Sequence, residues 1–273
     1  MTHDEPLVGA VKPPAVHLMT LNVRRRMPRL WPSPAADRWS HRRQLMQTLL
    51  RRERPGILGV QEALPDQADA IGEMLGSSYA SVGGGRGRDG RGERCVLFVD
   101  TARFVVQDSS TWWLSATPTR AASRSFGNRI PRIVTQATLA DRVSGSPLTV
   151  FVTHFDHLSA RSRLRSARML SRSVEAVEGP VVVLGDFNAD ADSAPHRALT
   201  AGGVLVDAFD VAERRLSETR GTFSRYGAPQ PHGRRLDWIL TDPSAVVSAA
   251  GVNAGWALSD HDPVHAVVTW RAM

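Results

Sequence analysis

The chain has 273 residues, which is enough for one large domain with a full hydrophobic core. Its 34 basic residues exceed its 27 acidic residues, and Lys12 is the only lysine, so nearly all of the positive charge is arginine. The single Cys95 excludes an intrachain disulfide, and the sequence has no run of 18 apolar residues that could span a membrane.

Residues 1–14 are expected to form a flexible leader that ends at Pro13-Pro14. This leader carries acidic residues and has no apolar core of the kind that signal peptides contain. We therefore expect a cytoplasmic protein, with one catalytic domain over residues 15–273.

Apolar runs bounded by turn residues predict most of the secondary structure. We expect strands at residues 16–23, 57–60, 95–99, 104–114, 133–139, 148–153, 181–184, 236–241, 245–252 and 264–270. We expect helices around residues 45–50 and over residues 66–76 and 158–178, and loops at residues 24–37, 83–94 and 115–131. Strands outnumber helices, and several strands follow one another directly. This pattern favours an α/β protein of the α+β type, with two packed, mostly antiparallel sheets and helices outside them.

Gly185-Asp186-Phe187-Asn188 follows the buried run at residues 181–184. If the strand continues, Asp186 and Asn188 point to the same side, because strand side chains alternate. A carboxylate and a carboxamide on one face can hold a water molecule and direct it toward phosphorus. The alternative is an ordinary Asp/Asn turn after a strand.

The same spacing occurs in Thr153-His154-Phe155-Asp156-His157, where His154 and Asp156 are two residues apart. A histidine at this position can donate a hydrogen bond to a phosphate oxygen. His157 is expected to face the other side if the strand continues.

Ser259-Asp260-His261 precedes the last strand, and Asp237 begins another strand. An acid beside a histidine offers one metal ligand and one proton-transfer group. Asp237 can accept the second N–H of His261, which would fix the tautomer and favour the charged ring.

Glu62 and Asn22 each follow a buried strand. If Glu62, Asp186 and Asp260 converge, two carboxylates about 4 Å apart repel each other by roughly 4 kcal/mol at an effective dielectric of 20. A divalent cation relieves this repulsion. Because the ligand set is rich in oxygen and lacks thiolates, Mg²⁺ or Mn²⁺ fits better than structural zinc.

Taken in order, these motifs resemble the endonuclease/exonuclease/phosphatase superfamily, and in particular a bacterial branch of uncertain substrate. The resemblance extends from about residue 16 to about residue 270. It implies a four-layer fold and a metal-dependent phosphoesterase that hydrolyses a phosphodiester or phosphomonoester by in-line attack of an activated water. One departure is Ala116, where that bacterial branch commonly has an acid.

The resemblance also implies roles for individual residues. Glu62 would hold the metal with Asn22 and Asp260, while Asp186 and Asn188 would position or deprotonate the water. His154 and His261 would bind the phosphoryl oxygens, with His261 oriented by Asp237. Substrate binding is assigned to His154, Asp156, Asn188 and Arg132.

The substrate class stays open between a small phosphorylated molecule and a nucleic acid. The arginine-rich loops at residues 24–29 and 83–94 could clamp a polyanion, or they could be ordinary surface loops. Trp31, Trp112 and Trp113 could stack on a base or a sugar, or they could belong to the core. A nuclease specific for DNA or RNA, or an inactive phosphate-binding module on the same fold, are the alternatives to a general phosphoesterase.

Overall fold

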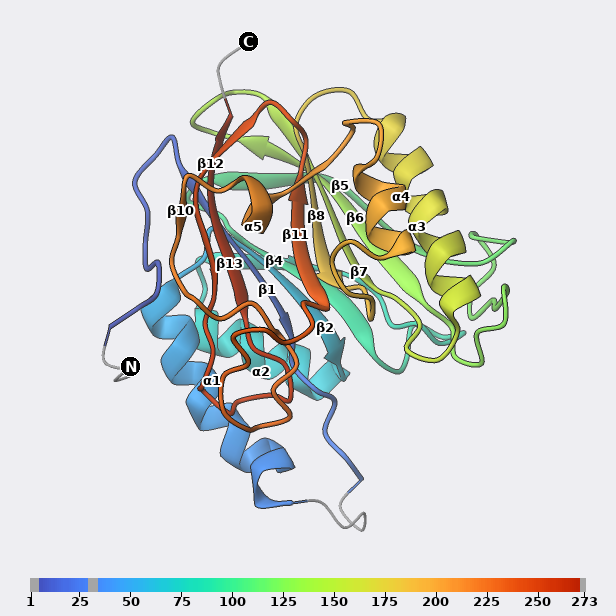
Figure 1. The fold of residues 1–273 in the computed structure, drawn as a ribbon, viewed down its shortest axis with the longest axis horizontal. Coiled ribbons are helices and arrows are strands. Elements are labelled where there is room, and N and C mark those ends of the chain that lie inside the picture. Colours follow the sequence, from blue (N-terminus) through green and yellow to red (C-terminus); the bar gives the residue numbers. More distant parts are fainter. Residues whose placement is uncertain (1–4, 29–33, 271–273) are drawn as a thin grey trace.

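The computed structural model describes residues 5–28 and 34–270, in which two mixed β-sheets pack face to face (Figure 1). The first sheet has the strand order β10-β12-β13-β1-β2-β4-β3. Its strands are β10 (Arg214–Arg215), β12 (Ala245–Val252), β13 (Val264–Trp270), β1 (Val16–Asn22), β2 (Ile57–Ala63), β4 (Arg94–Asp100) and β3 (Tyr79–Val82). The pairs β1–β2 and β10–β12 are parallel, and the other pairs in this sheet are antiparallel over the described residues.

The second sheet has the strand order β5-β6-β7-β8-β11-β9. Its strands are β5 (Phe104–Trp113), β6 (Ile133–Asp141), β7 (Pro147–His154), β8 (Val181–Asp186), β11 (Asp237–Thr241) and β9 (Val206–Asp207). Only β7 and β8 pair in parallel among these described strands, because α3 (Ala160–Glu175) connects them.

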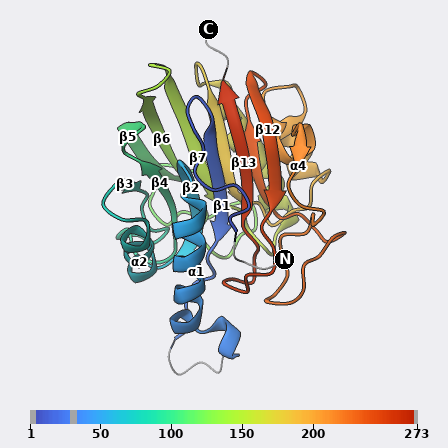
Figure 2. The same ribbon diagram turned by 90° about the vertical axis from the view of Figure 1, so that its left-hand side faces the viewer.

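Helices cover the outer faces of both sheets and complete the four layers. The helices α1 (Trp39–Glu53) and α2 (Pro65–Leu75) lie on the first sheet (Figure 2), and their apolar residues pack against it. On the second sheet the cover is α3 together with α4 (Ala194–Thr200). A single 3₁₀ turn (Ala35–Asp37) precedes α1, and the short α5 (Ala208–Val211) contacts β11 and β12.

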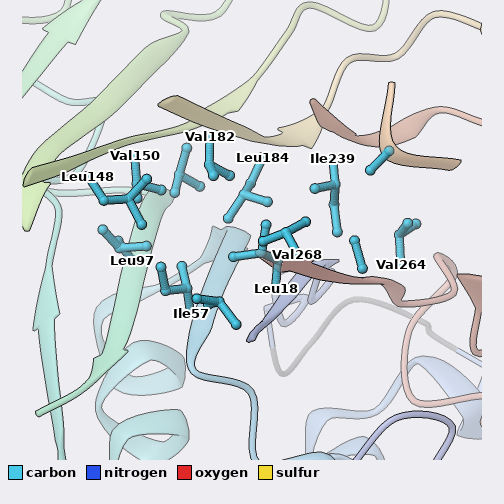
Figure 3. Packing of buried hydrophobic residues seen from close by; sticks show 14 of the residues in the cluster. Leu18, Ile57, Leu97, Leu148, Val150, Val182, Leu184, Ile239, Val264 and Val268 are labelled. Atoms are coloured by element: carbon cyan, nitrogen blue, oxygen red, sulfur yellow. The ribbon is translucent and has the colours of Figure 1, made fainter. Parts of the chain in front are cut away.

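The largest apolar cluster fills the space between the two sheets with branched aliphatic side chains (Figure 3). The sheets approach each other closely at Gly59 of β2. A Cβ added there would lie 3.1 Å from Leu184 and 3.3 Å from Val152, which are both on the opposite sheet. The close packing of the two sheets therefore favours a residue without a side chain at position 59.

The expected fold class is confirmed, and the predicted strands and helices all occur with small shifts at their ends. The expected strands and helices did not include β3, α4, α5, β9, β10 or the 3₁₀ turn, which are short and lack a long apolar period. No described helix is both long enough and apolar enough to cross a bilayer.

Residues 7–9 of the N-terminal segment are hydrogen-bonded to the domain. The backbone N–H groups of Leu7, Val8 and Gly9 donate to the carboxylate of Glu53, at 2.7, 3.1 and 3.1 Å. Glu53 is the last residue of α1, so the segment is attached to the domain by a charged group that the sequence pattern of the helix does not reveal.

Candidate active site

The candidate site lies where strands of both sheets end close together. In the second sheet, Asp186 of β8 pairs with His154 of β7 on one side and with Asp237 of β11 on the other. In the first sheet, Asn22 ends β1, and its side-chain amide donates to Asp186 Oδ2 across the two sheets at 2.9 Å. The strand ends thus bring residues from distant parts of the sequence to one place.

Asp186 is the centre of this arrangement and is almost completely buried. Its Oδ2 atom lies 3.5 Å from His154 Nε2 and 3.7 Å from His261 Nε2, while its Oδ1 atom accepts the backbone N–H of Asn188 at 2.8 Å. Burial raises the pKa of Asp186 to about 7, although the charge of His261 opposes this rise. A carboxylate with such a pKa is suited to accept a proton near neutral pH.

Asn188 reaches the site by a different route from the one expected. The strand ends at Asp186, and Asn188 adopts a left-handed conformation with φ of 49°. Its amide donates to the carbonyl of Phe155 at 3.1 Å and lies 3.5 Å from Asp186 Oδ2. Asp186 and Asn188 therefore do meet in the cavity, but through a turn and not through strand alternation.

His261 lies next to two carboxylates of the site, Asp237 and Asp186. Its Nδ1 atom and Asp237 Oδ2 are 2.8 Å apart, and Phe223 packs beside its ring with centroids 4.8 Å apart. Burial alone would lower the pKa of His261, but the carboxylates of Asp237 and Asp186 outweigh burial and raise it well above the ordinary value. The imidazole is therefore positively charged at neutral pH.

His154 sits on the opposite side and has the opposite electrostatic surroundings. Burial lowers the pKa of His154 well below its ordinary value, and the charges of Arg132 and Arg86 lower it further. The ring is therefore neutral at neutral pH. A neutral imidazole can still donate one hydrogen bond to a phosphoryl oxygen.

Glu62 and Asp260 form the part of the site best suited to a cation. Glu62 follows an irregularity in the pairing of β2 with β4 and has φ of 63°, so its side chain leaves the strand pattern. Burial would raise the pKa of Glu62, but hydrogen bonds from the Asn22 amide (3.1 Å) and the Arg25 N–H (3.1 Å) lower it instead. Burial raises the pKa of Asp260, and the charge of Glu62 raises it further.

These two carboxylates repel each other, and a divalent cation between them would remove that repulsion, so the donor set fits Mg²⁺ or Mn²⁺. Among the described residues near the cavity, a tighter group of possible ligand atoms is Asp186, Asp237 and His261, within 4.8 Å of one another. We regard that group as a hydrogen-bonded imidazole and carboxylate pair, because Asp237 Oδ2 is already engaged by His261.

Asn22 is oriented differently from a direct ligand. Its amide nitrogen donates to both Glu62 and Asp186, and its oxygen accepts the backbone N–H of Arg24 at 2.9 Å. In this arrangement Asn22 links the two carboxylates. Its predicted contact with the metal would require the amide to turn.

A cavity of about 390 Å³ opens onto these groups. Among the predicted site residues, those that line it are Glu62, Arg132, His154, Asp186, Asn188, Asp260 and His261. Asn22 and Asp237 lie behind the wall and contact residues that line it. They therefore act through other side chains in this structure.

Asp156 does not reach the cavity, contrary to its expected place in substrate binding. The strand ends at His154, and Asp156 Oδ2 accepts the backbone N–H groups of Leu158 and Ser159 at 3.1 and 2.7 Å. Its other oxygen lies 3.6 Å from Arg132 Nε. Asp156 therefore holds a turn and positions Arg132.

Several cavity residues were not singled out from the sequence. His157, expected to face away, lines the cavity and lies 2.8 Å from Arg132 through its Nδ1 atom. Arg86 and Glu93 come from the loop at residues 83–94, and Phe223 comes from the long connection before β11. No periodic pattern marks them, because all three lie in irregular segments.

The tryptophans do not form part of the described cavity. Trp112 and Trp113 pack against the apolar clusters on the two faces of the second sheet, which agrees with their alternative assignment to the core. Trp31 lies outside the described residues. From the loop at residues 24–29, Arg24 and Arg25 line the cavity.

Comparison with solved structures shows the same fold in several proteins. An endonuclease/exonuclease/phosphatase from Bacteroides vulgatus is 28% identical, with 94% of this chain and 99% of that chain covered and a TM-score of 0.86. A mannosyl-6-phosphatase from Bacteroides thetaiotaomicron is 24% identical, with 93% and 100% covered and a TM-score of 0.85. D. rerio TDP2, complexed with a single-strand DNA product, is 16% identical, with 94% and 99% covered and a TM-score of 0.71.

No curated protein sequence matches the chain. The sequence model of one family, however, matches residues 19–261, which include every predicted site residue. Since this match spans most of the chain, the protein belongs to the Endonuclease/Exonuclease/phosphatase family.

Proposed function

We propose that the protein is a metal-dependent hydrolase of phosphate esters. The observation that carries this proposal is the position of Asp186, whose carboxylate lies between His154, His261 and the amide of Asn22. Few reactions need a base, a neutral hydrogen-bond donor and a cationic imidazole around one small cavity. Hydrolysis of a phosphate ester can use all three, because the base activates the water while the two donors stabilise the negative charge that develops on the phosphoryl oxygens.

Asp186, held by Asn188 and Asn22, orients a water molecule and accepts its proton. Charged His261 and neutral His154 donate hydrogen bonds to the phosphoryl oxygens from opposite sides. Asp237 keeps His261 charged and fixes its ring. Their combined effect is to stabilise the charge that develops during in-line displacement at phosphorus.

Glu62 and Asp260, with Asn22 nearby, would hold Mg²⁺ or Mn²⁺. When bound, such an ion supplies Lewis-acid stabilisation of the phosphoryl group. Each of these carboxylates is contacted by an arginine. Arg25 donates its backbone N–H to Glu62, and Arg24 lies 3.7 Å from Asp260. These contacts orient both carboxylates.

The named neighbours support a phosphorylated substrate. One is a mannosyl-6-phosphatase, and another is complexed with a single-strand DNA product. Both similarities are below 25% identity and establish the fold alone, so the proposal for this chain depends on its own residues.

The test is hydrolysis of p-nitrophenyl phosphate and bis(p-nitrophenyl) phosphate by the purified protein, with Mg²⁺ or Mn²⁺ and with EDTA. We expect turnover with the metal, its loss on chelation, and recovery when the metal is added back. Full activity in EDTA would contradict the proposal. Sugar phosphates and single-stranded oligonucleotides, assayed in parallel, would identify the natural class.

A further inference from the structure

Two arginines and His154 lie together in one part of the cavity wall. Arg132 and Arg86 both line the cavity, and both also line a smaller adjoining recess with His154. Arg25 also lines the cavity and lies 3.6 Å from Glu93, the carboxylate that pairs with Arg86. Arg24 also lines the cavity, but it lies 3.7 Å from Asp260 and is separate from this group.

Arg86 is the only arginine between residues 83 and 92 that reaches the described cavity, and its loop holds it there. The backbone of the loop is fixed to β5 by Gly84 N–H donating to Thr111 Oγ1 at 3.1 Å and by the indole of Trp113 donating to the Arg86 carbonyl at 2.9 Å. The Arg86 N–H also donates to the Glu93 carbonyl at 3.0 Å. By contrast, Arg91 is exposed.

The wall retains positive charge after its internal ion pairs are counted. Glu93 lies 2.6 Å from Arg86 and 3.6 Å from Arg25, and Asp156 lies 3.6 Å from Arg132. Three guanidinium groups thus share two carboxylates. Arg132 is only 3% exposed, and its Nε atom has no hydrogen-bond partner among the described residues.

We propose that the wall formed by Arg86 and Arg132 recognises the terminal, doubly charged phosphate of a small phosphomonoester and selects it over a phosphodiester. This inference rests on the proposed function and specifies its substrate class. A monoester presents three unsubstituted oxygens, so His261 and His154 can each take one while another faces the guanidinium groups. A diester has an ester arm in place of one of these oxygens and carries one charge less.

The size of the cavity supports the same conclusion. The cavity of about 390 Å³ suits a compact ligand, and its arginine side is closed by the buried Arg132 and by the anchored loop that carries Arg86. A second ester arm directed to that side would have to displace Arg86. An arm directed to the open side would leave the guanidinium groups facing a less charged phosphate.

The test compares kcat/KM for p-nitrophenyl phosphate with kcat/KM for bis(p-nitrophenyl) phosphate in the presence of Mg²⁺ or Mn²⁺. The wild-type protein is expected to prefer the monoester. Arg86→Gln should lower kcat/KM for the monoester by about tenfold or more, as loss of a charged hydrogen-bond pair does, and should lower the diester value much less, because the diester phosphate carries one charge less. Arg91→Gln is the matched control, because it removes an arginine of the same loop that is exposed.

Arg86→Lys retains the charge but not the planar fork, and it should give an intermediate preference. Circular dichroism of each variant confirms that the loop substitution leaves the fold intact. A wild-type preference for the diester, or an equal loss on both substrates in Arg86→Gln, would overturn the inference while leaving the proposed function in place.

If neither substrate is hydrolysed, the proposed function fails, and binding of inorganic phosphate tests the wall separately. Calorimetry in the presence of Mn²⁺ should show phosphate binding that Arg86→Gln weakens about tenfold and Arg91→Gln does not change. Equal phosphate binding by the wild-type protein and Arg86→Gln would overturn the role of the wall.

Discussion

Two of the clusters that combine buried histidine with carboxylate in the described part of the chain have opposite effects on their histidines. At the cavity, His261 contacts Asp237 and lies near Asp186. On the outer face of the first sheet, His17 and His265 lie beside Glu53, with all three side chains inaccessible to solvent. The carboxylates raise the pKa of His261 against the effect of burial, whereas burial lowers the pKa values of His17 and His265 to about 3.

The difference lies in what the carboxylate contacts. Glu53 accepts three backbone N–H groups of the N-terminal segment and the side-chain amide of Asn253 at 2.8 Å, and His265 Nδ1 is 3.9 Å away. Its charge is thus already compensated. His17 donates from Nδ1 to the Gly9 carbonyl at 2.9 Å, so its Nε2 atom accepts from His265 Nδ1 at 2.8 Å.

The neutral histidine pair and Glu53 therefore act as a fastening for the N-terminal segment. Asp237, in contrast, directs one oxygen at His261, and His261 lines a cavity open to a ligand. Histidine next to a carboxylate indicates a reactive site only where the carboxylate is not already saturated by amides. Four predictions test this distinction.

The largest effect is expected at Asp186. Asp186→Asn removes the proton acceptor at the centre of the cavity and should lower kcat roughly 10³- to 10⁴-fold. The melting temperature should not fall, because the substitution also removes a buried charge that lies near Asp237. Steady-state kinetics and thermal unfolding of the same preparation check both parts, and a near-normal kcat would show that another group accepts the proton.

A smaller loss of activity is expected from Asp237→Asn. The asparagine cannot stabilise the charged ring of His261, so kcat should fall roughly 10²-fold while KM changes little. The variant should still bind inorganic phosphate in the presence of Mn²⁺, which calorimetry measures. Unchanged turnover would mean that His261 does not need Asp237 to act.

A substitution in the cluster of His17, His265 and Glu53 should change the stability of the protein and not its turnover. Glu53→Gln replaces a charge-assisted acceptor of four N–H groups by an amide that can accept at one oxygen only, so unfolding free energy should fall by about 2–3 kcal/mol. Urea denaturation measures this loss, and kcat at a temperature where the variant is folded should match the wild type. A large fall in kcat with unchanged stability would refute the distinction between the clusters.

The effect that is smallest near neutral pH is the pH dependence of stability. His17 and His265 have pKa values of about 3 when folded and about 6.5 when unfolded, so only the unfolded chain gains these protons as the pH falls below 6.5. Stability should therefore be unaffected by these groups above pH 6.5 and should decline between pH 6.5 and pH 3, by about 2 kcal/mol at pH 5.5.

Urea denaturation across this pH range provides the measurement. His265→Asn keeps a donor near Nδ1 but removes a titrating group, so its stability should depend less on pH than that of the wild type. His41→Gln is the matched control, because His41 is exposed on α1. An equally steep pH dependence in His265→Asn would assign the acid sensitivity to other groups.

Sequence patterns predicted the strands and the approximate position of the site well, because buried strands leave continuous apolar runs and their polar end residues follow directly. These patterns were less successful in predicting whether a residue after a strand end faces the cavity. Asp156 and Asn188 both follow strand ends by two residues, yet only Asn188 enters the cavity. A left-handed turn in one case and a capped turn in the other decide this, and neither has a clear sequence signal.

Residues from irregular segments were the least predictable. Arg86 is one of several arginines in a glycine-rich loop, and only its anchoring by Trp113 distinguishes it from Arg91. Likewise, the hydrogen bonds from residues 7–9 to Glu53 depend on the tertiary position of the end of α1. Such long-range contacts cannot be inferred from local periodicity.

The close approach of the sheets at Gly59 has a consequence for the evolution of turnover. Glu62 is three residues further along β2, while Leu184, which would touch a side chain at position 59, is two residues before Asp186. A methyl group at position 59 would press on Leu184 and Val152, so these side chains, or the strands that carry Glu62 and Asp186, would have to move by a few tenths of an ångström. The distance between the two sheets at Gly59 can thus change the alignment of the site residues, even when the residues that touch the substrate stay the same.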